Sequence, residues 1–307
     1  MDDVALQAEE KALTMALGPR AKTWLGRIGA FLGLAGVVFV GIRLHGYAGE
    51  IDFRRMGAGS YAAIAALAGV YGASNLLLAL GWRHLMHHAG VQVSRSWAVR
   101  AYAVSQLAKY VPGNIFQFAG RQAIGLAAGI GNGPLVKSTL HELAFLVAGG
   151  VLFSPLVLPL VLTGLPNWLG WISFIAAVAI VLCVAVRAGG ADFGAAAVFY
   201  LAFLALSGVV FAAACDLAGG TGRVALYPAI AGAYVVAWLV GLVTPGAPAG
   251  IGIREAILLV LLGGLSTGPI ILLAVVIGRI ITVLGDLLFF AGGQIAGYFY
   301  RTGDERG

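Results

Sequence analysis

Two stretches of this sequence share one pattern, and that pattern decides the fold. Lys109–Arg121 reads KYVPGNIFQFAGR, and Leu242–Arg254 reads LVTPGAPAGIGIR. In each stretch a Pro-Gly pair is followed by seven residues and then an arginine, and the two copies lie 133 positions apart. Proline and glycine interrupt helices, so each stretch predicts a break between two helical segments. The simplest interpretation is a duplicated unit of one membrane helix and one Pro-Gly element.

The composition is that of a protein with many membrane helices. Of its 307 residues, 60% are hydrophobic and only 10% are charged, and the mean hydropathy is +0.95. Soluble domains carry about 25% charged residues, and no polar segment here is long enough to form such a domain. We therefore expect an all-α polytopic protein of the inner membrane and not a soluble enzyme.

Apolar runs of about 20 residues are long enough to cross a bilayer. Six runs meet this length and predict full spans: Ile28–Leu44, Ser60–Trp82, Leu135–Phe153, Trp168–Val186, Gly194–Leu217 and Pro269–Tyr298. Four shorter segments flank the Pro-Gly sites: Trp97–Tyr110, Asn114–Ile130, Leu226–Val243 and Ile251–Leu265. We expect each pair to form a re-entrant helical hairpin whose tip is buried in protein or lines a polar cavity. The predicted tips are Pro112 and Gly113 in the first hairpin and Pro245 and Gly246 in the second.

The expected organisation is a single transmembrane domain over 28–300, with a cytoplasmic segment 1–27 before it and a short cytoplasmic tail 301–307 after it. The repeat halves are 60–153 and 193–300. The bias of lysine and arginine favours both termini inside, and we expect no removable signal peptide. The helices Ser60–Trp82 and Gly194–Leu217 then cross in opposite directions, which predicts an inverted-topology repeat with its substrate site between the halves.

The arginine after each Pro-Gly pair is a candidate contact for a lipid phosphate. At 1.5 Å per residue it lies about 13 Å from the tip, so Arg121 would sit near the inner headgroups and Arg254 near the outer ones. The planar guanidinium suits phosphate. The alternative for Arg121 is an ordinary cytoplasmic anchor. The alternative for Arg254 is a structural ion pair with its neighbour Glu255.

Two further charges are predicted to lie deep in the membrane. Glu142 is about 12 Å from the inner face and Arg279 about 15 Å from the outer face, so their depths nearly coincide. Because intramembrane charges usually pair or mark a pathway, we expect Glu142 and Arg279 to meet, with His141 and Asp286 in the same polar interior. A purely structural salt bridge is the alternative.

Other polar residues give weaker signals. Tyr110, Asn114 and Gln117, with Tyr102, Gln106 and Gln122, would line a cavity able to hydrogen-bond headgroups, or would only satisfy the backbone of the first hairpin. His84, His87 and His88 have helical spacing, but an interfacial anchor is favoured over a metal site because no acidic or cysteine partner lies near. Cys183 and Cys215 lie in apolar runs, so no disulfide is expected. Neither a P-loop nor a G-x-S-x-G motif occurs, and no cofactor is expected.

Three segments resemble the lysylphosphatidylglycerol synthase transmembrane-region family. They are SQLAKYVPGNIFQFAGR (Ser105–Arg121), the glutamate of HEL (Glu142) and TPGAPAGIGIRE (Thr244–Glu255). The resemblance implies movement of a lipid between leaflets, carried by Arg121, Glu142, Arg254 and Glu255. No aminoacyl-transferase domain like that of the family is expected in this chain, so its substrate could be another anionic or glycosylated lipid.

The leading hypothesis is therefore a lipid translocase, passive or coupled to an ion or proton gradient. The alternatives are a membrane-embedded transferase for lipid-linked sugars, with Glu142, Glu255 or Asp286 as its acid or base, and a non-catalytic scaffold for a lipid-synthesis system. The expected partners are membrane lipids and a lipid-modifying synthase, and no nucleic acid is expected.

The predicted topology is testable by cysteine labelling in intact cells. Cysteines introduced at Ser154 and Leu226 should react with an impermeant maleimide from outside, whereas one at Ser94 should react only after permeabilisation. The opposite result at Leu226 would remove the inverted repeat.

Overall fold

The structure, a computed structural model, describes residues 57–110, 116–162, 165–220, 223–244 and 252–304, and these residues are helical with no strand. The predicted span Ile28–Leu44, the four predicted tip residues and Asn114 lie outside the described residues. Five described stretches are long and apolar enough to cross a membrane. The chain is therefore a multi-pass membrane protein. The helices are α3 (Ala58–His88), α4 (Arg95–Gln106), η2 (Leu107–Tyr110), α5 (Phe116–Ala127), α6 (Asn132–Leu152), α7 (Ser154–Val161), α8 (Asn167–Leu217), η3 (Val224–Leu226), α9 (Tyr227–Val243), α10 (Ile253–Leu262) and α11 (Gly268–Asp304).

Three of the predicted spans fall on α3, α6 and α11. The helix after Leu135 is longer than expected, because α6 is followed directly by α7 and the apolar stretch continues from Asn132 to Val161. Ser154 thus lies inside that stretch and not in a connection. In the cysteine-labelling experiment, a cysteine at the exposed Pro166 therefore replaces the one at Ser154.

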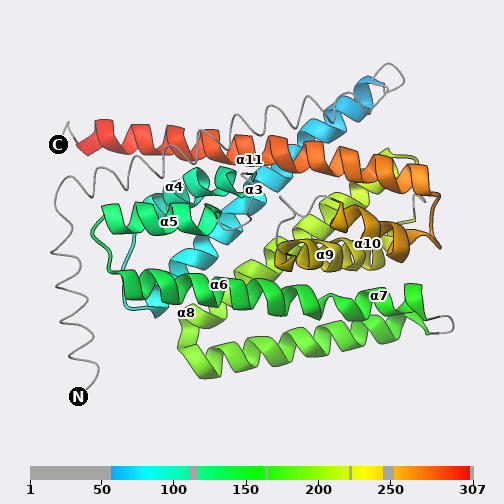
Figure 1. Ribbon diagram of the computed structural model, residues 1–307, viewed down its shortest axis with the longest axis horizontal. Helices are drawn as coiled ribbons and strands as arrows, with labels where there is room; N and C mark the ends of the chain where they lie inside the picture. The colour runs from blue at the N-terminus through cyan, green and yellow to red at the C-terminus, as the bar shows by residue number, and fades with distance from the viewer. Residues whose placement is uncertain (1–56, 111–115, 163–164, 221–222, 245–251, 305–307) are drawn as a thin grey trace.

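The helix α8 is bent sharply at a single glycine. Gly190 has φ 76° and ψ −166°, a conformation with a left-handed φ that glycine adopts without a steric penalty. The bend separates two helical arms, which cover the predicted spans Trp168–Val186 and Gly194–Leu217 (Figure 1). The first arm runs along one side of the molecule, and the second crosses its interior.

The short helices form two groups at opposite ends of the molecule: α4 with α5, and α9 with α10 (Figure 1). The order of α3, α4, α5 and α6 recurs in the second arm of α8, α9, α10 and α11, and matching helices start 132 to 137 positions apart. One expectation is not met. With η3, α9 forms a 20-residue apolar stretch, Val224–Val243, which is long enough to cross the membrane and was expected to be a short arm.

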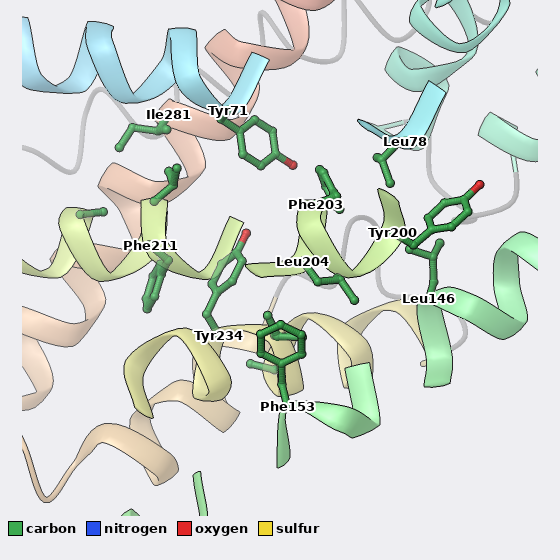
Figure 2. Packing of buried hydrophobic residues seen from close by; sticks show 14 of the residues in the cluster. Tyr71, Leu78, Leu146, Phe153, Tyr200, Phe203, Leu204, Phe211, Tyr234 and Ile281 are labelled. Carbon is green, nitrogen blue, oxygen red and sulfur yellow. The ribbon is translucent and has the colours of Figure 1, made fainter. Parts of the chain in front are cut away.

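The core is centred on the second arm of α8. Tyr200, Phe203, Leu204 and Phe211 project from this arm towards the surrounding helices (Figure 2). The rings of Phe211 and Tyr234 from α9 stack with centroids 4.7 Å apart. The second arm therefore joins the two ends of the molecule through packed aromatic side chains.

The helices α3 and α11 approach each other most closely at two glycines. A Cβ added to Gly72 would lie 2.8 Å from the carbonyl oxygen of Gly285, and one added to Gly285 would lie 2.8 Å from the nitrogen of Gly72. Small residues at membrane helix crossings allow such close backbone contact. The contact holds Asn75 of α3 beside Asp286 of α11, which hydrogen-bond at 3.1 Å.

The Gly72→Ala change should therefore destabilise the protein by about 1–3 kcal/mol, because the backbones must separate to admit the methyl group. The matched control is Gly69→Ala on the same helix, where nothing lies within 4 Å of the added Cβ. Unfolding experiments in mixed detergent micelles measure the stability of both variants. Equal stability of the two variants would show that the crossing is looser than described.

Candidate functional site

The first charge centre is a buried ion pair between Arg121 and Glu142. The arginine Nη2 lies 2.7 Å from Glu142 Oε2, and the Tyr102 hydroxyl donates to Glu142 Oε1 at 2.8 Å. Arg121 is 2% exposed and Glu142 0%. Both carboxylate oxygens thus have a donor, as a buried carboxylate requires.

Three different helices build this centre. The contacting side chains come from α4, α5 and α6, and the Gln122 amide ties α5 to α6 by donating to the Leu135 carbonyl and the Thr139 hydroxyl, each at 2.9 Å. The guanidinium carbon of Arg121 lies 4.1 Å from the centre of the Tyr102 ring. Aromatic faces and a carboxylate together hold this cation away from solvent.

The second charge centre is formed around Asp286 in the middle of α11. Lys109 Nζ lies 2.7 Å from Asp286 Oδ2, and the lysine is 20% exposed whereas the aspartate is 0%. Asn75 donates to the other carboxylate oxygen at 3.1 Å, and the Tyr110 hydroxyl also donates to Asp286. Gln106 in turn donates to the Asn75 side-chain oxygen at 3.2 Å. This network fastens α4 and η2 to the crossing of α3 and α11.

The third charge centre lies between α10 and α11. Arg279 Nη2 is 3.1 Å from Glu255 Oε1. Arg254, the residue before Glu255, has its guanidinium carbon 5.8 Å from the Trp238 ring. Its Nε is buried and has no hydrogen-bond partner, and no described carboxylate forms an ion pair with it. Arg254 and Arg279 both line a small cavity between α8, α9, α10 and α11, together with Phe211, Tyr234, Leu258, Val275, Gly278 and Thr282.

The predicted contact between Glu142 and Arg279 is wrong, since Glu142 binds Arg121 and Arg279 binds Glu255. The two residues do not meet because α3 and the second arm of α8 lie between α6 and α11 (Figure 1). The alternative pairing of Arg254 with Glu255 does not form either, because the Glu255 carboxylate is turned towards Arg279.

The sequence reasoning also missed the role of Lys109. Its side chain pairs with the buried Asp286. Its position three residues before a predicted membrane-embedded tip was the signal that could have found it. Of the remaining predicted residues, Tyr110 belongs to the same centre, and Gln117 is partly buried on α5. His141 lies apart, with its ring 5.4 Å from that of His88.

The three clustered histidines attach the end of α3 to the bend in α8. His84 Nδ1 lies 2.7 Å from Asp192 Oδ1, and His88 Nδ1 lies 3.0 Å from the Gly189 carbonyl oxygen. His87 Nε2 lies 3.2 Å from the Val93 carbonyl oxygen. In the part of the chain that the structure describes, no three metal-ligating side chains are placed to hold an ion.

Breaking the first charge centre should be costly. Glu142→Gln leaves Arg121 buried without a counter-charge, so we expect about 3–5 kcal/mol of stability to be lost. The double change Arg121→Met with Glu142→Leu removes both charges and should recover most of that loss. Thermal unfolding in detergent checks this, with the exposed Arg100→Ala as control. Wild-type stability of the Glu142→Gln protein would mean that the pair contributes little to folding.

Comparison with protein-family models and with curated protein sequences finds no match for this chain. The resemblance carried by Ser105–Arg121, Glu142 and Thr244–Glu255 therefore stays a prediction.

Proposed function

We propose that this protein is a lipid translocase, which moves a lipid between the two leaflets of the inner membrane. The lipid is anionic or phosphate-bearing, and it could also be aminoacylated or glycosylated. The observation that carries the proposal is Arg254, which lies at a cavity inside a membrane domain without an ion-pair partner among the described residues. An arginine held in apolar surroundings is costly, and such residues usually mark a pathway or a ligand. A phosphate group would supply the missing counter-charge.

The arrangement of the helices supports transport. We infer that 60–153 and 193–300 are two copies of one unit with inverted topology, with both chain termini inside. The recurring helix order and the placement of α4 and α5 opposite α9 and α10 support this interpretation (Figure 1). Secondary transporters built from inverted repeats bind their substrates near the midplane between the copies, at broken helices. The two Pro-Gly sites would supply those breaks.

The chemistry of the carboxylates favours a translocase over a sugar transferase. Glu142 accepts from Arg121 and Tyr102, and Asp286 accepts from Lys109 and Asn75. Both oxygens of each carboxylate are therefore occupied by donors from the protein itself. Neither residue is thus arranged for acid or base catalysis. Transport would be passive or driven by an ion or proton gradient.

Arg254→Ala should abolish lipid movement in liposomes while leaving the fold intact, because no described carboxylate loses its ion-pair partner. The purified protein is reconstituted with fluorescent phosphatidylglycerol, and dithionite reports the fraction of label that reaches the outer leaflet. Arg254→Lys should retain part of the activity, since lysine keeps the charge but loses the bidentate fork.

The matched control is Arg100→Ala, which removes an exposed arginine from α4. Vesicles that hold an entrapped dye exclude leakage as the cause of quenching. Unchanged lipid movement in the Arg254→Ala protein would contradict the proposal. Loss of folding in that variant would instead give Arg254 a structural role.

A further inference from the structure

The two arginines that follow the Pro-Gly pairs differ in what faces them. Arg121 and Arg254 lie 133 positions apart, and so do Glu142 and Val275. Glu142 of α6 pairs with Arg121 at 2.7 Å, whereas Val275 of α11 lines the cavity beside Arg254. Where the first site has a carboxylate, the second has an apolar side chain and a space.

The charges on the long helices differ in the same way. Glu142 and Leu146 are one turn apart on α6, and their counterparts on α11 are Val275 and Arg279. The same helix face is therefore negative in the first site and positive in the second. Among the described residues, Glu255 pairs with Arg279 through Oε1 and its Oε2 has no hydrogen-bond partner, and no carboxylate forms an ion pair with Arg254.

The guanidinium of Arg254 has an unsatisfied donor. Its Nε is buried without a hydrogen-bond partner, and a buried donor left unpaired is unfavourable. The adjoining cavity has a volume of about 20 Å³, and about 10–15 Å³ is enough for one water-sized group. The cavity is therefore large enough for a single oxygen atom. Tyr234 and Thr282 also line the cavity, and the Thr282 hydroxyl donates to the Arg279 carbonyl at 3.0 Å.

We propose that the cavity beside Arg254 is a phosphate-binding site, in which a phosphate oxygen takes the place that the Glu142 carboxylate holds beside Arg121. The second half of the protein is then open to an external anion, whereas the first half is closed by an internal one. That the phosphate belongs to a lipid headgroup rests on the proposed function. The binding itself does not require transport.

Supplying an internal carboxylate at the second site tests this directly. In the purified full chain, inorganic phosphate and dihexanoyl phosphatidic acid are titrated calorimetrically at constant ionic strength. Val275→Glu should weaken the binding of both probes at least about tenfold, because its carboxylate neutralises Arg254. The matched control Val275→Gln has nearly the same size without the charge and should bind more tightly than Val275→Glu.

The reciprocal change tests the same idea in the first half. Glu142→Val removes the internal carboxylate from Arg121, so phosphate should raise the thermal stability of this variant more than that of the wild type. Should Val275→Glu fail to fold, Arg254→Gln replaces it and should also lose at least about tenfold in affinity.

Equal phosphate affinity in the wild type, Val275→Glu and Arg254→Gln overturns the proposal, and so does failure of the wild type to bind either probe. Binding of phosphatidic acid alone identifies a lipid headgroup as the source, whereas binding of both probes identifies any accessible phosphate. Phosphate binding without lipid transfer in liposomes would refute only the proposed translocase. Lipid transfer without phosphate binding would refute only the anion site.

Discussion

Every charged side chain in the interior of this protein is subject to the cost of leaving water, which in apolar surroundings amounts to several kcal/mol for each ion. Glu142 meets this cost with Arg121 and Tyr102, and Asp286 meets it with Lys109, Asn75 and Tyr110. Each buried charge depends on its partner, because loss of one partner leaves the other charge unpaired in apolar surroundings. Among the described residues, Arg254 has no such ion-pair partner, and the proposed function is based on this difference.

The charge centres also explain why the short helices stay in place. Tyr102 of α4 and Arg121 of α5 bind these two helices to Glu142 of α6. The helix η2 is held by Lys109 and Tyr110 at Asp286 of α11. A long helix thus provides the acidic residue in each case, and the short helices provide its cationic partner and a tyrosine hydroxyl.

Much of the helical arrangement could be predicted from sequence, because apolar run length fixes where a membrane helix can lie. Which helices lie side by side could not be predicted from run length. Depth along a helix placed Glu142 and Arg279 at one level, yet the intervening α3 and α8 keep them apart. The 133-residue repeat held more information than the depth argument, since it aligns Glu142 with Val275 and thereby indicates which arginine lacks a carboxylate.

The bend at Gly190 separates two arms of α8 with different environments. The second arm is packed among α3, α9 and α11. The first arm exposes a run of branched apolar side chains, among them Ile172, Ile175, Ile180 and Val184, each more than half exposed. On such a surface one branched apolar residue serves as well as another, because lipid tails have no fixed shape to match. The first arm should therefore accumulate substitutions faster than the second during evolution, provided that its length and apolar character are kept.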